Sequence, residues 1–205
     1  MPPLIEQAPV SGVILAAGMS RRLGRPKQLL DFGGEALLRR VVRQALASDL
    51  AEVILVLGHE GEAIAAAVGE LGQRVVINPA YEAGQSTSLR CGLRAVDPRV
   101  AAVMFLLGDQ PHVGAEIINT LIRAFRESAA PIVVPTYGGT AGNPALFARE
   151  IFPELAAIEG DRGAREIVQR YGDRVLRVPV SDGPPPRDID TEEDYLAALR
   201  ELGIN

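Results

Sequence analysis

Residues 13–27, V-I-L-A-A-G-M-S-R-R-L-G-R-P-K, have the composition of an anion-binding loop. They begin with an apolar, partly β-branched run, which predicts a buried strand over 13–17. Gly18 and Gly24 allow backbone N–H groups to approach an anion closely, and Arg22 and Lys27 add positive charge. This combination predicts a phosphate site, and the alternative is an ordinary turn with a solvated basic patch.

Two acidic segments supply candidates for a metal site. Asp109 lies in G-D-Q-P, directly after the most hydrophobic run of the chain, and Asp190 lies in D-I-D-T. Ligands of open α/β sheets bind beyond the carboxyl ends of the strands, and Mg²⁺ prefers oxygen ligands. Taken alone, the first segment is compatible with a turn and the second with a helix cap. Together with the glycine loop, both indicate metal ligands.

The spacing of the loop excludes two common phosphate-binding motifs. A Walker A loop requires G-x-x-x-x-G-K-[ST], but Gly18 and Gly24 are one residue too far apart and Lys27 comes too late. A dinucleotide fingerprint requires three glycines and an acidic residue near the end of the second strand. The chain has only two glycines in this loop, and its second predicted strand is followed by Gly58 and His59.

The remaining pattern, L-A-A-G-x-S-x-R-x-G-x-x-K, resembles the signature of the MobA-like nucleotidyltransferases. It is most similar to the members that transfer CMP or GMP to molybdopterin, with Leu23 where methionine is common. The resemblance implies that Arg22 and Lys27 stabilise charge on the phosphates. It also implies a nucleotide contact for the matching residues Leu15, Ala16, Ala17, Gly18 and Lys27.

Further segments follow the same family in order. Residues 84–89, G-Q-S-T-S-L, and the preceding Asn78 resemble its ribose- and base-recognition segment, which implies nucleotide binding by Asn78, Gly84 and Ser88. Residues 107–111 resemble L-G-D-M-P, whose aspartate binds the metal, and D-I-D-T implies that Asp190 completes that site. Residues 142–147 and 160–165 resemble G-x-P-x-x-F and G-D-x-G-A-R, which implies acceptor binding by Asn143, Asp161 and Arg165. Asn143 stands where the family often has histidine, so we assign it no role that needs imidazole.

The resemblance implies a Mg²⁺-dependent transfer of a nucleoside monophosphate to an acceptor phosphate, with release of pyrophosphate. Positioning and electrostatic stabilisation carry such a reaction, so we expect Arg22, Lys27 and Asp109 to be catalytic. The acceptor phosphate is already ionised, and no protein base is required. The implied partners are a nucleoside triphosphate, a molybdopterin-type or other phosphate acceptor, and a molybdoenzyme that receives the product.

The choice of base and acceptor stays open at this point. The methyl group of Ala17 narrows the base pocket, which favours CTP over GTP. A guanylyltransferase, or a transferase acting on a sugar phosphate or another small phosphate, is the alternative within the family. From other classes, an NAD(P)H oxidoreductase and a molybdenum-cofactor chaperone compete with this interpretation.

Hydrophobic periodicity predicts how these segments are positioned. Apolar runs predict strands over 13–17, 53–57, 74–77, 100–107, 132–135 and 174–180, with a short extended piece over 29–32 and a flexible turn over 137–143. Helical spacing predicts helices over 35–48, 60–71, 86–96, 115–128, 149–158 and 164–171, and a last helix capped by Thr191. The alternation indicates an α/β protein with a mostly parallel central sheet and helices on both faces. The resemblance implies a three-layer, Rossmann-like nucleotidyltransferase fold.

Length and composition restrict the classes of protein. The 205 residues predict a single domain over 1–205, with a nucleotide-binding part at about 10–112 and an acceptor-binding, metal-completing part at about 113–205. The net charge of -5 favours a small anionic ligand over nucleic acid, which needs a broad basic face. One cysteine excludes an internal disulfide. The chain has neither a signal peptide nor an apolar run of about 20 residues, so we expect a cytoplasmic protein without a membrane partner.

Overall fold

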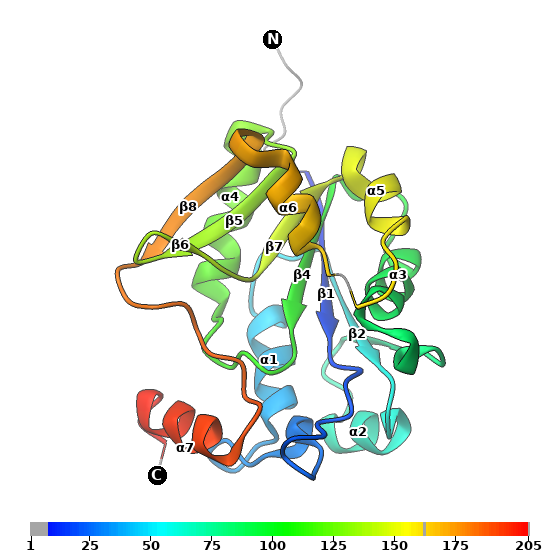
Figure 1. Ribbon diagram of the computed structural model, residues 1–205, viewed down its shortest axis with the longest axis vertical. Coiled ribbons are helices and arrows are strands. Elements are labelled where there is room, and N and C mark those ends of the chain that lie inside the picture. The colour runs from blue at the N-terminus through cyan, green and yellow to red at the C-terminus, as the bar shows by residue number, and fades with distance from the viewer. Residues whose placement is uncertain (1–7, 162, 205) are drawn as a thin grey trace.

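The computed structural model describes residues 8–161 and 163–204. Within these ranges, eight strands form one sheet in the order β3-β2-β1-β4-β7-β5-β6, and β8 pairs with β5. Their bounds are β1 (Val10–Leu15), β2 (Glu52–Leu57), β3 (Arg74–Ile77), β4 (Ala102–Leu107), β5 (Ile132–Tyr137), β6 (Thr140–Ala141), β7 (Ala145–Ala148) and β8 (Val175–Ser181). Figure 1 shows this sheet running through the centre of the molecule.

The sheet is mostly parallel, as the sequence predicts. β1 pairs in parallel with β2 and β4, β2 with β3, and β5 with β8, whereas β7 is antiparallel to both β4 and β5. Leu15 lies opposite Leu107, so β1 and β4 end side by side. The glycine loop after β1 and the G-D-Q-P segment after β4 therefore begin at the same edge of the sheet.

Helices cover both faces of the sheet, which confirms the predicted layers. The face covered by α1, α2 and α4 carries one apolar cluster, and the face covered by α3, α5 and α6 carries another. The α-helices of the described residues are α1 (Leu37–Leu46), α2 (Gly61–Val68), α3 (Gln85–Ala95), α4 (Ala115–Ser128), α5 (Phe152–Ala156), α6 (Arg165–Tyr171) and α7 (Glu192–Glu201). Every helix in these ranges is too short or too polar to cross a membrane.

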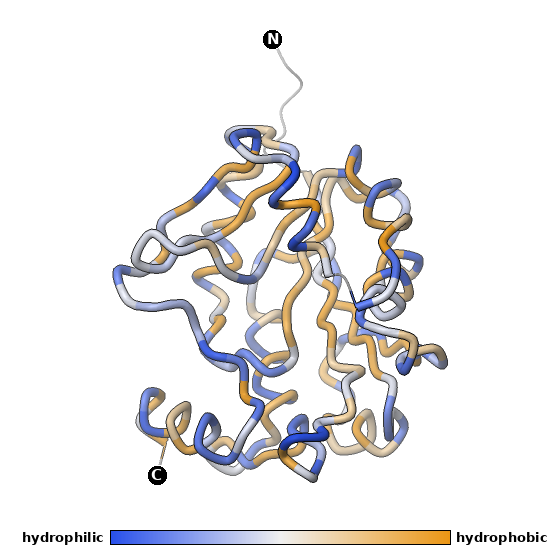
Figure 2. Tube along the Cα trace, in the orientation of Figure 1, coloured by the Kyte–Doolittle hydropathy of each residue, from blue (hydrophilic) through white to orange (hydrophobic). Residues whose placement is uncertain are grey.

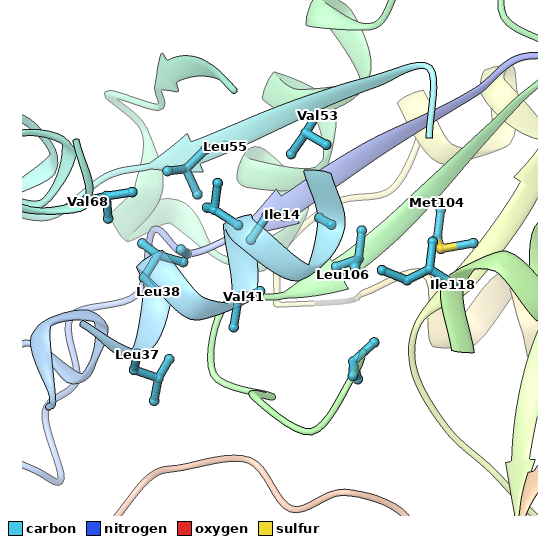
Figure 3. Packing of buried hydrophobic residues seen from close by; sticks show 14 of the residues in the cluster. Ile14, Leu37, Leu38, Val41, Val53, Leu55, Val68, Met104, Leu106 and Ile118 are labelled. Carbon is cyan, nitrogen blue, oxygen red and sulfur yellow. The ribbon is translucent and has the colours of Figure 1, made fainter. Parts of the chain in front are cut away.

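The larger core lies between α1 and the parallel strands. Leu38 and Val41 of α1 lie over Ile14 of β1 and Leu106 of β4, and Ile118 of α4 extends the same layer (Figure 3). β4 is buried along nearly its whole length, as expected for a central strand. Figure 2 shows hydrophobic segments along the central strands and hydrophilic segments in the loops around them.

Several local predictions differ from the structure. The extended piece predicted over 29–32 overlaps the end of a 3-10 turn, Lys27–Leu29, and only an isolated bridge joins Asp31 to Ala36. β1 begins at Val10 and ends at Leu15, before the predicted end at residue 17. The expected flexible turn over 137–143 contains the β5–β6 hairpin. The predicted helix over 149–158 is a 3-10 turn, Arg149–Ile151, followed by the short α5.

The last helix begins as predicted. The Thr191 hydroxyl accepts a hydrogen bond from the Asp194 backbone N–H, and the Asp194 carboxylate accepts one from the Thr191 backbone N–H. This reciprocal cap fixes the start of α7. Asp190 directly precedes the capping residue Thr191, so the cap also fixes the backbone position from which the Asp190 side chain extends.

Candidate active site

A cavity of about 460 Å³ lies at the carboxyl ends of β1 and β4. We call it the first cavity. Nine of the residues singled out in the sequence line it, namely Leu15, Ala16, Ala17, Gly18, Lys27, Gly84, Ser88, Asp109 and Asp161. The glycine loop and the start of α3 thus face each other across one space, as the resemblance implies for a nucleotide site.

The glycine loop is held by a residue that sequence reasoning missed. Gln28 is buried, and its Nε2 donates hydrogen bonds to the carbonyl oxygens of Ala16 at 3.0 Å and Gly18 at 3.1 Å. The Ser20 hydroxyl accepts a hydrogen bond from the Lys27 backbone N–H at 3.1 Å. These bonds fold the loop back on the end of β1 and fix the backbone of Lys27 beside it. The position directly after the lysine was the only sequence signal for Gln28.

Lys27 lies between the two predicted metal ligands. Its Nζ is 2.5 Å from Asp109 Oδ2 and 3.1 Å from Asp190 Oδ1, and Arg22 Nη2 is 2.7 Å from Asp190 Oδ2. Arg22 and Asp190 line a hollow beside the first cavity. Lys27 and Gly18 line both the hollow and the first cavity. The structure thus brings the predicted catalytic residues Arg22, Lys27 and Asp109 together with Asp190, through chain segments more than 80 residues apart.

Burial governs the charges of this cluster. Desolvation opposes the charge on Lys27, but Asp109 and Asp190 outweigh it, so the pKa of the ammonium is raised. Desolvation also raises the pKa of Asp109, against the opposing effect of Lys27. The Lys27 ammonium therefore offsets only part of the desolvation of the Asp109 carboxylate.

The site has the donors that a divalent cation requires. Asp109 Oδ1 is buried and has no hydrogen-bond partner, which leaves one carboxylate oxygen for a ligand. Asp188 also lines the first cavity and acts electrostatically on Asp109, while its Oδ1 accepts a hydrogen bond from Gln110 Nε2 at 2.8 Å. Sequence reasoning gave Asp188 no role, although it is the first acid of D-I-D-T.

The described residues contain no group of three or more His, Cys, Asp or Glu side chains that could hold a metal ion by themselves. A metal held by Asp109 with Asp188 or Asp190 would therefore complete its coordination with oxygens from water or from a substrate. Mg²⁺ is commonly held in this way, by one or two carboxylates plus phosphate oxygens. The donor set fits a metal that arrives with a triphosphate.

Asn78 lies behind the wall of the first cavity. It is 3% exposed, and its Nδ2 donates hydrogen bonds to Thr87 Oγ1 at 2.9 Å and Ser88 Oγ at 3.0 Å. Its own Oδ1 accepts a hydrogen bond from the Ala80 backbone N–H at 3.0 Å. Asn78 is absent from the lining of the cavity, so it fixes the start of α3 and reaches a ligand only through Ser88.

A second cavity, of about 440 Å³, adjoins the first one. The two share Leu15, Gln85 and Leu107 in their linings. Asn143 and Arg165 line the second cavity, whereas Asp161 lines the first, so the three predicted acceptor-binding residues do not converge. The remaining polar side chains are Gln169 and Arg177, which no sequence motif indicated.

The two cavities carry opposite charge patterns. The first is lined by two cations, Arg21 and Lys27, and by four carboxylates, those of Glu82, Asp109, Asp161 and Asp188. Among the described residues that line the second cavity, Arg165 and Arg177 are charged and no carboxylate is present. An anion can therefore enter the second cavity unaccompanied, whereas a polyanion in the first needs an additional cation.

Most of the chain is similar in sequence to known proteins. The sequence model of the MobA-like NTP transferase domain matches residues 12–175. The purine catabolism protein PucB of Bacillus subtilis is 31% identical over 202 residues, covering 93% of this chain and 96% of PucB. Nicotine blue oxidoreductase of Paenarthrobacter nicotinovorans is 29% identical over 199 residues, with coverages of 93% and 96%.

Solved structures show the same fold. The structure of Rv0371c from Mycobacterium tuberculosis in complex with manganese superimposes with a TM-score of 0.82 and 34% identity, covering 94% of this chain and 98% of that one.

Proposed function

Because this chain belongs to the MobA-like NTP transferase family, we propose that it is a Mg²⁺-dependent nucleotidyltransferase that transfers CMP from CTP to the phosphate of a molybdopterin-type acceptor. The observation that carries the proposal is the convergence of Lys27 with Asp109 and Asp190, where the first cavity adjoins the hollow lined by Arg22 and Asp190. When a metal–triphosphate complex binds, the carboxylates can coordinate the metal, and the flexible Lys27 side chain can turn its ammonium toward the phosphates.

The proposed reaction is one displacement at phosphorus. An oxygen of the acceptor phosphate forms a bond to the α-phosphorus of CTP. The bond from that phosphorus to the bridging oxygen of the β-phosphate breaks, and its electron pair leaves with pyrophosphate. The product is a phosphoanhydride. Both reactants are anionic, so electrostatic stabilisation and alignment supply most of the rate enhancement.

Each part of the site has a task in this reaction. The backbone around Gly18 binds phosphate oxygens, and Lys27 exchanges its carboxylate partners for the phosphates. Arg22 stabilises the leaving pyrophosphate with a forked guanidinium. Asp109, together with Asp188 or Asp190, holds the Mg²⁺ ion, which neutralises charge on the transferred phosphate when it is bound.

The charge patterns favour one assignment of substrates to cavities. The four carboxylates of the first cavity match a nucleotide that enters as its metal complex. The second cavity, with Arg165 and Arg177, matches an anionic acceptor that enters without metal. Because the cavities meet at Leu15, Leu107 and Gln85, an acceptor phosphate at this junction would face the nucleotide.

The preference for CTP rests on Ala17. This residue lines the first cavity and is 6% exposed, and its carbonyl oxygen accepts a hydrogen bond from the His59 backbone N–H at 3.4 Å. Its methyl group takes space in the wall of the cavity, which favours a single-ring base.

Pyrophosphate release tests the proposal. Purified protein with Mg²⁺ and molybdopterin should release pyrophosphate from CTP faster than from GTP, ATP or UTP, and should retain CMP on the pterin product. Release with a sugar phosphate but not with molybdopterin would overturn the acceptor. Failure of CTP and GTP to bind by calorimetry in the presence of Mg²⁺ would overturn the proposed activity altogether.

A second candidate is suggested by the name of one relative, the nicotine blue oxidoreductase. The loop after β1 lacks the three-glycine fingerprint that holds a dinucleotide pyrophosphate, so we favour nucleotidyl transfer. A titration with NADPH decides between them, because saturable NADPH binding without CTP binding would favour the oxidoreductase. A chaperone that only binds the finished cofactor would instead keep full function after loss of the Asp109 carboxylate.

A further inference from the structure

The floor of the second cavity is a row of residues that crosses four adjacent strands. Phe105 of β4 lies opposite Ala145 of β7, and Val134 of β5 lies opposite Arg177 of β8. The antiparallel register of β5 and β7, with Val133 opposite Leu146, continues to place Val134 beside Ala145. Since these four residues all line the cavity, the cavity runs across the strands and ends at a guanidinium.

The strand spacing gives the length of this row. Three steps between neighbouring strands place the Cα atom of Arg177 roughly 14 Å from the Cα atom of Phe105. The inner end of the cavity lies two residues further along β4, at Leu107, where the first cavity begins. A ligand whose phosphate reaches the nucleotide at Leu107 therefore has to be elongated if its other end reaches Arg177.

Apolar side chains lie on both faces of the space between the two ends. Leu89 of α3 and Val168 of α6 lie above a floor made by Phe105, Ala145 and Val134. Figure 1 shows α3 and α6 on this same side of the sheet. These apolar surfaces accommodate the faces of a flat, unsaturated ring, and Gln85, Asn143 and Gln169, which also line the cavity, offer hydrogen bonds to polar groups on its edges.

Arg177 is available to a ligand at the outer end. Its side chain is exposed, and its Nη1 donates one hydrogen bond, to the Gly172 carbonyl oxygen at 3.3 Å. A guanidinium has five N–H donors, so most of its donors remain for an anion or a carbonyl edge.

We propose that Arg177 is a specificity-determining residue, which binds an anionic or carbonyl group at the end of the acceptor distant from its reacting phosphate. The inference rests on the proposed function and restricts its acceptor. The acceptor is elongated, with a flat ring over Phe105 and Val134 and an electron-rich group at Arg177. A chain of four carbons spans only about 5 Å with bond lengths near 1.5 Å, so a short sugar phosphate cannot make both contacts.

Arg177→Met tests this contact, and Arg174→Met is the matched control. Arg174 is also exposed, but its guanidinium lies 4.2 Å from the centre of the Tyr171 ring and it does not line the cavity. Binding is measured by fluorescence titration with a pterin monophosphate and, separately, by calorimetry with inorganic phosphate. We expect Arg177→Met to weaken pterin monophosphate binding about tenfold or more, and to leave inorganic phosphate binding at the junction within twofold.

The control and a conservative variant define the outcomes. Arg174→Met should bind both probes as the wild type does, and Arg177→Lys should recover part of the pterin affinity. Equal losses in both methionine variants, or an equal effect of Arg177→Met on the two probes, would overturn the inference. Unchanged melting temperatures show that the variants fold.

Pyrophosphate release separates this inference from the proposed function. If the wild type binds the pterin through Arg177 but never releases pyrophosphate, nucleotidyl transfer is wrong and the Arg177 contact stands. If pyrophosphate is released and Arg177→Met leaves the acceptor KM unchanged, the transfer stands and the inference is wrong.

Discussion

The ammonium of Lys27 lies 2.5 Å from the carboxylate of Asp109, and a second carboxylate, that of Asp190, lies 3.1 Å from the same nitrogen. The side chains of Lys27 and Asp109 are 16% and 15% exposed, so solvent screens this pair weakly. Lys27 therefore forms ion pairs with Asp109 and Asp190, the carboxylates that are proposed to bind the metal. Lys27 and a divalent cation compete for the negative charge of the same carboxylates, until a triphosphate offers Lys27 other partners.

This competition predicts an unusual effect of Lys27→Met. Without nucleotide, the variant should bind Mn²⁺ at least tenfold more tightly than the wild type, because unit charges about 4 Å apart already interact by about 4 kcal/mol at an effective dielectric constant of 20. Turnover should nevertheless fall about a hundredfold or more, because the phosphates lose a cation. Electron paramagnetic resonance of free Mn²⁺ measures the affinity directly.

Arg25→Met is the control for the loss of one positive charge from the loop. Arg25 pairs with Glu192 at 2.7 Å and both side chains are more than half exposed, so its removal should change Mn²⁺ affinity less than twofold. Weaker or unchanged Mn²⁺ binding by Lys27→Met would contradict the competition.

Asp188 should contribute to metal binding even though sequence reasoning passed over it. We expect Asp188→Asn to weaken Mn²⁺ binding in the presence of CTP about tenfold, since it removes a charge from the first cavity beside Asp109. The hydrogen bond from Gln110 can persist with the asparagine oxygen, so stability should change little. Asp182→Asn, in the same segment but outside the cavity lining, provides the comparison. Equal affinities in the two variants would exclude Asp188 from the metal site.

Ala17→Gly should shift the base preference. Removing the methyl group widens the first cavity at this position, so the ratio of kcat/KM for CTP to that for GTP should fall several-fold, within the range expected for one methylene-sized change. Competition between the two nucleotides in a single pyrophosphate-release assay measures this ratio. A constant ratio would show that the base is read elsewhere in the cavity.

Sequence patterns predicted which segments contribute to this site better than they predicted how those segments come together. The apolar runs of β1 and β4 placed the glycine loop and Asp109 at strand ends, because local hydrophobicity reports burial. No local pattern could place Arg177, since its position in the second cavity depends on the pairing of β8 with β5 across 43 residues of chain. The same limit applies to Asn78, whose side chain turned out to support Ser88 from behind the cavity wall.

The acceptor-binding prediction shows this limit most clearly. The sequence predicts one acceptor-binding segment over 160–165, but two described residues of this segment line different cavities. Asp161 faces the first cavity and Arg165 the second, because the segment rests on the start of α3. Its backbone contact with Gly84 is long-range information that a single sequence does not contain.

That contact predicts the effect of Gly84→Ala. Gly84 has a φ of +107°, and a Cβ atom there would lie 2.6 Å from the carbonyl group of Gly160, whose oxygen also accepts the Ser86 backbone N–H at 3.2 Å. Backbone strain and this clash together should lower the free energy of unfolding by about 2–3 kcal/mol. The KM for CTP should rise as well, because Gly84 and Asp161 both line the first cavity.

Gly34→Ala separates the effect of backbone strain from the effect of the clash. Gly34 has a φ of +86° but open space around it, so this variant should lose only about 1 kcal/mol. Urea unfolding and CTP titration of both variants measure the difference, and equal losses with an unchanged KM would mean that the Gly84–Gly160 contact does not shape the cavity.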